Sequence, residues 1–97
     1  MLSYVFTDKA EHDLEEIIDF TVEHWGALQA IQYIDGLEEI AQTLADNPDI
    51  GLKRETMLEG LLSFPYQRHI LYYIKDFHGV SIIRVLHASM DSRKHIK

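Results

Sequence analysis

Residues 68–87 have the sequence RHILYYIKDFHGVSIIRVLH, and this stretch decides the fold. Residues 68–75 and 80–87 are rich in β-branched and aromatic side chains, which favour strands. The four residues between them, DFHG, end in a glycine, where a positive φ costs little, and so predict a hairpin loop. A further strand is predicted at residues 61–64, separated from the next by Pro65. The C-terminal half should therefore form a small antiparallel sheet.

The N-terminal half is predicted to be helical after a short strand at residues 2–6. Apolar residues recur at helical spacing over residues 8–25, and a second such stripe covers residues 27–46. Gly26 can end the first helix in a left-handed conformation, and the Asn-Pro pair at 47–48 stops the second. Because the connection between them is so short, the two helices should form an antiparallel hairpin.

The predicted order of elements is β-α-α-β-β-β, in a single domain spanning residues 1–97. This is an α+β fold, in which a helical hairpin packs on one face of a small antiparallel sheet. The last strand carries aliphatic residues on both faces, Ile82 and Leu86 on one and Ile83 and Val85 on the other. Two helices can cover only one face. The second face should stay partly open unless the C-terminal tail or a partner protein covers it.

Composition excludes several classes of protein. Apolar residues make up 46% of the chain and charged residues 26%, which is ordinary for a globular protein and unlike a disordered one. Cysteine is absent, so neither a disulfide nor a thiolate metal site can form. No apolar run approaches the roughly 20 residues of a membrane span, and the N-terminus lacks the pattern of a signal peptide. We therefore expect a soluble cytoplasmic protein with no attachment to a membrane.

The net charge of −7 is unevenly distributed along the chain. Residues 1–49 carry Lys9 against twelve carboxylates, a sum of −11, whereas residues 50–97 carry eight Lys or Arg against four carboxylates, a sum of +4. An acidic half repels phosphate, so any contact with nucleic acid would have to use the C-terminal half.

The sequence contains no glycine-rich phosphate loop and no nucleophile elbow, and its six histidines are scattered, so no metal site is predicted. Arginines on a small sheet can hold phosphate bidentately, and a nearby histidine can act as general acid or base in RNA cleavage. A structural interpretation instead pairs Arg84 with a carboxylate and leaves His87 to close a strand end. The residues open to both interpretations are Arg68, His69, Arg84, His87 and Arg93.

A series of short motifs in one order covers nearly the whole chain. It runs AEHDLEEIIDF (10–20), WG (25–26), AIQYIDGL (30–37), NPDIG (47–51), GLLSFP (60–65), RHILYY (68–73) and IRVLHASMD (83–91). Together these motifs resemble the ParE branch of the ParE/RelE toxin superfamily. The fold of that family, a helical hairpin on a C-terminal antiparallel sheet, is the one predicted above from the residues alone.

The resemblance implies the toxin component of a type II toxin–antitoxin system, which inhibits DNA gyrase by protein binding and is neutralised by a cognate antitoxin in a hetero-oligomer of the two. It implies no cofactor, no enzymatic activity and no sequence-specific binding of nucleic acid. Contacts with the antitoxin are expected on the hairpin and on the exposed sheet, at Trp25, Tyr33, Leu37, Leu71 and Tyr73. The hairpin residues among them are also core candidates, and the core interpretation is favoured for Leu37. Contacts with the target are expected near the C-terminus, at Arg84, His87, Met90, Asp91 and Arg93.

Two alternatives stay open. Ribonuclease members of the superfamily, the RelE type, cut ribosome-bound messenger RNA, and in that case Arg68, Arg84 and His87 would be the catalytic residues. The chain could also be a degenerate toxin that retains only the binding of its antitoxin.

Overall fold

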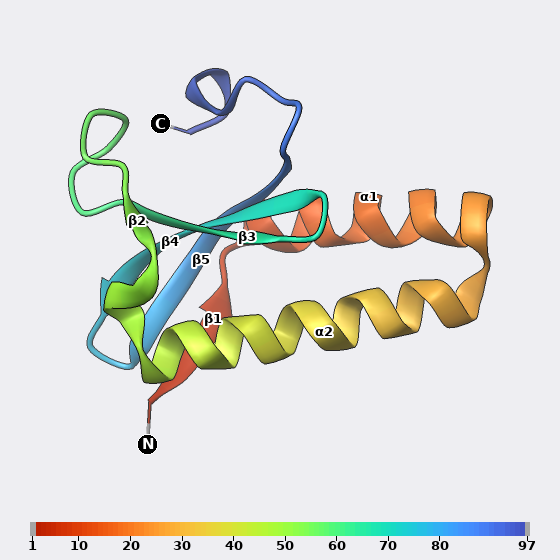
Figure 1. Ribbon diagram of the computed structural model, residues 1–97, viewed down its shortest axis with the longest axis horizontal. Helices are drawn as coiled ribbons and strands as arrows, with labels where there is room; N and C mark the ends of the chain where they lie inside the picture. Colours follow the sequence, from red (N-terminus) through yellow and green to blue (C-terminus); the bar gives the residue numbers. More distant parts are fainter. Residues whose placement is uncertain (1, 97) are drawn as a thin grey trace.

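The structure is a computed structural model that describes residues 2–96. A helical hairpin lies against a five-stranded sheet, and the C-terminal tail folds back over the sheet (Figure 1). In chain order the elements are β1 (Ser3–Phe6), α1 (Asp8–Trp25), α2 (Ala27–Asp46), a short 3-10 helix (Pro48–Ile50), β2 (Leu52–Lys53), β3 (Leu62–Tyr66), β4 (His69–Asp76), β5 (Gly79–His87) and a second 3-10 helix (Ser92–Lys94).

The sheet has the strand order β1-β5-β4-β3-β2. The pairs β3–β4 and β4–β5 are antiparallel as predicted. The strand β2, which was not predicted, also pairs antiparallel with β3, whereas β1 pairs with β5 in parallel and makes the sheet mixed. Gly79 permits this pairing, because its φ is +137° and a Cβ there would collide with the carbonyl oxygen of Ser3. The α+β prediction is therefore confirmed, with a parallel edge strand and the two-residue strand β2 as additions.

The two helices begin and end where the sequence predicts. Thr7 caps α1, since its hydroxyl accepts a hydrogen bond from the Ala10 amide at 3.3 Å. Gly26 joins the helices with a φ of +92°, and α2 ends at Asp46 before the Asn-Pro pair. Gly36, in the middle of α2, lies under the ring of Tyr66, whose hydroxyl would collide with any Cβ at this position.

Two turns differ from the prediction. Pro65 lies inside β3 rather than between strands, which is tolerated because β2 pairs only with the first two residues of β3 and leaves the outer edge beyond them unpaired. The loop between β4 and β5 has two residues rather than four, since Asp76 pairs directly with Gly79.

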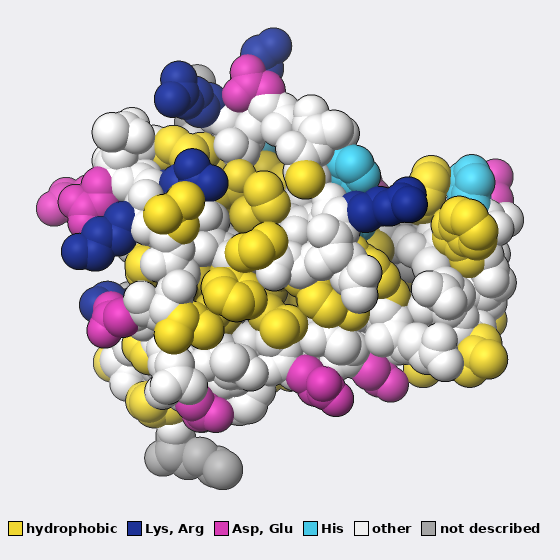
Figure 2. Space-filling view, viewed as in Figure 1, with side chains coloured by type: hydrophobic (Ala, Val, Ile, Leu, Met, Phe, Trp, Pro, Cys, Tyr) yellow, Lys and Arg dark blue, Asp and Glu magenta, His cyan; other side chains and the backbone are white. Residues whose placement is uncertain are grey.

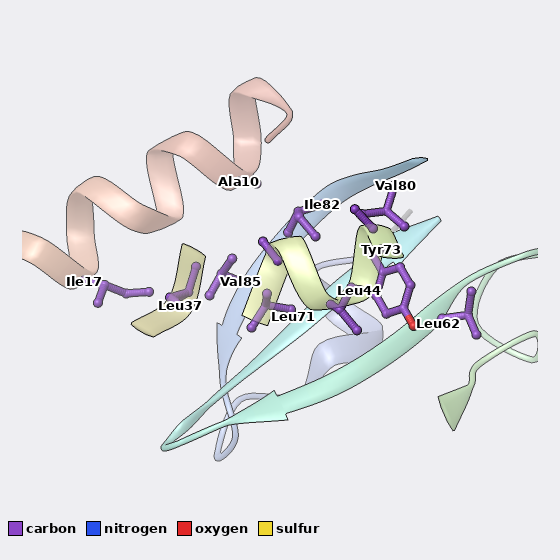
Figure 3. Packing of buried hydrophobic residues seen from close by; sticks show 12 residues of the cluster. Ala10, Ile17, Leu37, Leu44, Leu62, Leu71, Tyr73, Val80, Ile82 and Val85 are labelled. Carbon is purple, nitrogen blue, oxygen red and sulfur yellow. The ribbon is translucent and has the colours of Figure 1, made fainter. Parts of the chain in front are cut away.

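The main hydrophobic core lies between the hairpin and the sheet (Figure 3). Leu37 and Leu44 of α2 meet Leu71 and Tyr73 of β4, and all four side chains are fully buried. The hydroxyl of Tyr73 donates to the carbonyl oxygen of Pro48 at 2.7 Å, so the buried phenol is satisfied. This core attaches one part of the hairpin firmly to the sheet.

A β-bulge explains why β5 carries aliphatic residues on both faces. Tyr73 pairs with Ile82 and Tyr72 pairs with Arg84, so Ile83 is an extra residue in β5. The alternation is reset at this point: Ile82 and Val85 both join the core under the helices. Ile83 instead joins a second cluster on the opposite face.

The second face of the sheet is covered by the chain itself. Ile96 in the C-terminal tail is 3% exposed and packs there with Leu61, Tyr72 and Leu86. Of the two covers that the sequence analysis allowed, the tail and a partner protein, it is the tail that lies on this face.

Candidate functional site

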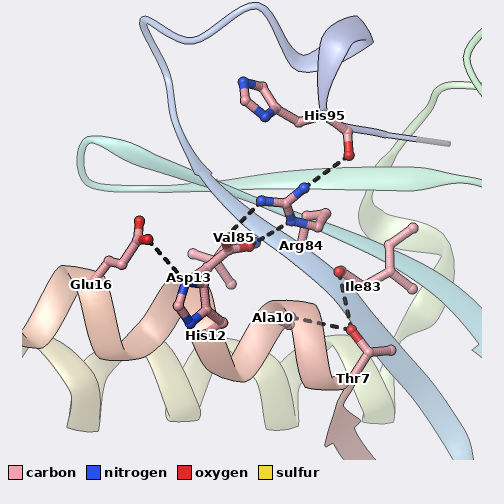
Figure 4. A network of polar contacts seen from close by, with 9 residues as sticks. All are labelled: Thr7, Ala10, His12, Asp13, Glu16, Ile83, Arg84, Val85 and His95. Atoms are coloured by element: carbon pink, nitrogen blue, oxygen red, sulfur yellow. Dashed lines mark hydrogen bonds and ion pairs between the residues drawn. The ribbon is translucent and has the colours of Figure 1, made fainter.

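A buried ion pair joins α1 to β5 (Figure 4). Arg84 donates from Nε to Oδ2 of Asp13 and from Nη2 to Oδ1, both at 2.8 Å, and from Nη1 to the carbonyl oxygen of His95 at 2.9 Å. These bonds use all three guanidinium nitrogens, and the bonds to Asp13 raise the pKa of Arg84. The structural interpretation of Arg84 is therefore confirmed: the side chain connects α1, β5 and the tail.

The position of Asp13 follows from the short length of β1. Because β1 pairs only as far as Ile82, the rest of β5 has a free edge. Asp13 Oδ2 accepts a hydrogen bond from the Val85 amide at 2.9 Å, and the Thr7 hydroxyl donates to the Ile83 carbonyl oxygen at 3.1 Å. Side chains at the start of α1 thus replace the missing strand.

A second polar cluster lies where α2 passes the end of β4. The Tyr33 hydroxyl and His69 Nδ1 are 2.6 Å apart, and the Tyr66 hydroxyl donates to the Tyr33 carbonyl oxygen at 3.0 Å. The ring of His87 packs edge-on against His69, with centroids 5.3 Å apart. Burial, with a further contribution from His87, lowers the pKa of His69 to about 4, and burial raises the pKa of Tyr33 to about 12. Both groups are therefore neutral at neutral pH.

The proposed ribonuclease trio is not brought together. Arg84 directs its guanidinium to Asp13 and the tail, whereas His87 packs on His69 on the helix side of the sheet. Arg68 is exposed, and its backbone carbonyl oxygen accepts a hydrogen bond from the Ala88 amide at 2.8 Å. His87 Nδ1 accepts a hydrogen bond from the Ser89 amide at 3.1 Å, so this histidine also closes the end of its strand, as the structural interpretation expects.

The residues expected to contact the target fall into two groups. His87, the last residue of β5, is exposed, and so are Met90, Asp91 and Arg93 in the segment that follows the strand. Asp91 Oδ1 accepts from the Arg93 amide at 3.2 Å and so starts the last 3-10 helix. Arg84 does not belong to this surface, because its guanidinium is already bound inside the chain.

The residues expected to contact an antitoxin also separate. Trp25 is exposed and Tyr33 is half-buried, so both are accessible. Leu71 and Tyr73 are fully buried in the core, which corrects the prediction that they form part of a surface, and Leu37 is fully buried as its core interpretation expects. The spacing of apolar residues shows that a residue belongs to the apolar face of its helix or strand. Core residues and residues that contact a partner give the same spacing.

Sequence analysis missed several large apolar side chains that lie outside the core. On α2, Leu28 and Ile31 are exposed, and they fall outside the stripe that predicts the buried face of this helix. On α1, Ile18 and Val22 belong to the predicted stripe and yet are exposed. Two features of the sequence could have indicated these exposed residues: the apolar stripe on α1 is wide, and α2 carries apolar residues outside its stripe.

A shallow groove of about 460 Å³ lies between the start of α1, β5 and the tail, and Ile83 and Ile96 are among its lining residues. Arg84 and His95 also line it, so it belongs to the ion-pair cluster already described. Within residues 2–96, no three side chains of the metal-ligating types come close enough together to hold a metal ion. Over the same residues, neither helix combines the length and apolar character of a membrane span.

Comparison with known proteins identifies the class of protein. The family model described as ParE toxin of type II toxin-antitoxin system, parDE, matches residues 4–92. The chain is 31% identical over 96 residues to Toxin ParE1 of Caulobacter vibrioides, covering 99% of each chain, and 33% identical over 94 residues to Toxin ParE1 of Mycobacterium tuberculosis, covering 96% of each.

The fold is shared with a solved structure titled chromosomal ParDE TA system from P. aeruginosa. The TM-score is 0.74 at 21% identity, over 90% of this chain and 96% of that one. The chain therefore belongs to the ParE toxin family of type II toxin–antitoxin systems.

Proposed function

We propose that this protein acts in the cytoplasm as a toxin that inhibits DNA gyrase by binding it, and that a cognate antitoxin neutralises it by covering part of its surface. Membership of the ParE family supports both parts of the proposal. The structural observation that carries it is the row of large apolar side chains left exposed on the helical hairpin. Exposed apolar surface of this kind is typical of proteins that bind other proteins.

The segment after β5 is the proposed contact with the target. Met90 is 41% exposed and neighbours the exposed side chains of His87, Asp91 and Arg93. The segment is held in place at both ends, by the hydrogen bonds of β5 and by the burial of Ile96. A short exposed segment between two fixed ends offers a preorganised binding surface with little loss of entropy.

The ribonuclease alternative has no such support. The guanidinium of its Arg84 is bound to Asp13 through two hydrogen bonds, so it is not free to hold a phosphate. We propose a toxin that acts by binding, without a cofactor and without sequence-specific contacts to nucleic acid.

The test uses the purified full chain in a gyrase supercoiling assay. We expect supercoiling to stop and cleaved DNA to accumulate, while a translating extract keeps its messenger RNA intact. Adding the protein encoded beside this gene should restore supercoiling. Replacing both Met90 and Arg93 by alanine should weaken the inhibition about tenfold or more, as for the loss of contacts at the centre of an interface. Phe77→Ser, in the loop between β4 and β5, is the control that should change nothing.

Other results would redirect the proposal. Cut messenger RNA in the extract, abolished by His87→Ala, would establish the ribonuclease function instead. Expression that leaves growth normal without any antitoxin, together with an unaffected gyrase, would identify a degenerate toxin that only binds its partner.

A further inference from the structure

Residues 88–96, which follow β5, have a defined backbone shape. The Ala88 amide donates to the Arg68 carbonyl oxygen at 2.8 Å and fixes the start of the segment. Near its end, the Ile96 amide donates to the Ser92 carbonyl oxygen at 3.0 Å. Figure 2 shows basic and acidic side chains exposed at the top of the view, where this segment lies in Figure 1. The charged side chains of the segment are therefore presented by an ordered backbone.

Arg84 connects the end of this segment to the body of the protein through a side chain (Figure 4). Its Nη1 donates to the His95 carbonyl oxygen at 2.9 Å, while Nε and Nη2 each donate to Asp13 at 2.8 Å. The side chains of Arg84 and Asp13 are 17% and 8% exposed, so little water competes for these bonds. Because a guanidinium is planar and rigid, the two bonds to Asp13 fix the direction of the third nitrogen. Asp13 on α1 thus determines the position of His95.

A second anchor of the tail, Ile96, acts in a different way. Its side chain is 3% exposed and packs with Leu61, Tyr72 and Leu86. Apolar burial is non-directional, so it keeps the tail on the sheet without selecting one orientation. Charge-assisted hydrogen bonds are directional. The contact with Arg84 therefore adds a fixed orientation to a tail that Ile96 holds in place.

We propose that Asp13 and Arg84 are positioning residues for the contact with the target, because they fix the end of the segment that presents Met90 and Arg93. Neither positioning residue has to touch the target, since both side chains are mostly buried. A binding segment that is already fixed in its bound shape loses less entropy on binding than a mobile one. This inference rests on the proposed function, in which the segment binds gyrase. It adds residues of α1 and β5 that determine how tightly the segment binds.

A variant that lacks both charges separates positioning from stability. Arg84→Ala alone leaves Asp13 buried without a partner and destabilises the whole protein. Asp13→Asn combined with Arg84→Met removes both charges, keeps a side-chain oxygen for the Val85 amide and fills the space with an unbranched apolar side chain. This double variant should therefore unfold at a higher urea concentration than Arg84→Ala. The His95 carbonyl oxygen loses its side-chain donor, so the end of the tail should move more freely.

Trypsin reports the position of the tail directly, because Arg93 and Lys94 are exposed cleavage sites within it. Cleavage there requires local opening of the 3-10 helix at Ser92–Lys94. We expect the double variant to lose the residues that follow these sites at least about fivefold faster than wild type, as measured by mass spectrometry. Leu37→Ala is the matched control, because it weakens the core on the opposite face of the sheet and should leave tail cleavage at the wild-type rate.

The same variants are then compared in the gyrase supercoiling assay. We expect the double variant to inhibit gyrase about tenfold more weakly than wild type, because the segment has to be ordered on binding. Leu37→Ala should inhibit as wild type does. Circular dichroism at the assay temperature establishes that both variants are folded.

Three results would overturn the proposal. Unchanged tail cleavage in the double variant would show that Ile96 is sufficient to hold the tail. Faster cleavage with unchanged inhibition would show that the orientation of the tail does not matter for the target. An equal loss of inhibition in the double variant and in Leu37→Ala would assign the effect to stability. If wild type itself leaves gyrase unaffected, the proposed function fails, whereas faster tail cleavage in the double variant still supports the anchoring of the tail by Asp13 and Arg84.

Discussion

The base of the hairpin, which lies against the sheet, and its tip, at the Gly26 turn, are built from the same two helices. The apolar side chains differ in burial between these two regions. At the base, Ile17, Leu37 and Leu44 are buried against the sheet. At the tip, Val22 and Ile31 point to solvent. Apolar side chains in a helical repeat are stable inside only where another element lies opposite them. Val22 directly follows the buried Thr21, and Ile31 directly follows the buried Ala30, so each lies about 100° around its helix from the buried face and stays exposed.

The largest loss of stability is expected when the buried ion pair near the base of the hairpin is broken. Arg84→Ala leaves the carboxylate of Asp13 buried without its guanidinium partner, and we expect a loss of about 3 to 5 kcal/mol in the free energy of unfolding. Denaturation by urea measures it. Arg93→Ala, at an exposed arginine, is the control and should leave stability within about 0.5 kcal/mol of wild type. A small loss for Arg84→Ala would show that the hairpin base is held by apolar packing alone.

Two leucines on one helix compare base and tip most directly. Leu37→Ala opens a cavity in the core, and we expect it to destabilise the protein by about 3 kcal/mol. Leu28→Ala removes the same atoms from an exposed position and should cost less than about 0.5 kcal/mol. Similar losses at the two positions would mean that Leu28 is buried in solution, for instance by self-association.

His69, which lies beside the base of the hairpin, should make the stability of the protein depend on pH. In the folded protein the pKa of His69 is about 4, against an ordinary value of 6.5, because burial and the neighbouring His87 disfavour the charged imidazolium. Below pH 6.5 the unfolded chain therefore takes up a proton that the folded chain refuses until about pH 4. The contribution of neutral His69 is complete above pH 6.5 and is lost progressively as the pH falls toward 4.

The test is to measure the free energy of unfolding of wild type and of His69→Gln between pH 6.5 and pH 4. The variant should show a smaller decline in stability between pH 6.5 and 4 than wild type. His24→Gln, at an exposed position near the tip, should decline as wild type does. An unchanged decline in His69→Gln would assign the pH dependence to other groups.

The smallest effect is expected at the tip itself. Trp25→Ala should change the free energy of unfolding by less than about 0.5 kcal/mol, because the indole is mostly in contact with solvent. The same substitution should weaken neutralisation by the antitoxin about tenfold or more, as for the loss of an aromatic anchor. Loss of stability without loss of neutralisation would reverse the roles assigned to base and tip.

The local structure of this protein can be predicted from its residues alone. Helical spacing of apolar residues placed both helices correctly, with Gly26 between them, because that periodicity is a property of consecutive residues. Strand-forming residues located β4 and β5 for the same reason. The motifs also identified the family, which the comparisons confirm.

Contacts between residues far apart in the sequence depend on the assembled fold. Asp13 and Arg84 are 71 positions apart, and only the free edge of β5 beside α1 makes them partners. The bulge at Ile83 decided which aliphatic side chains face the helices, because one inserted residue exchanges the two faces of a strand. Spacing shows that Leu37 and Val22 each lie on an apolar face, but the packing of the assembled fold makes Leu37 a core residue and leaves Val22 exposed. Burial depends on what lies opposite a residue, and that is a property of the assembled fold.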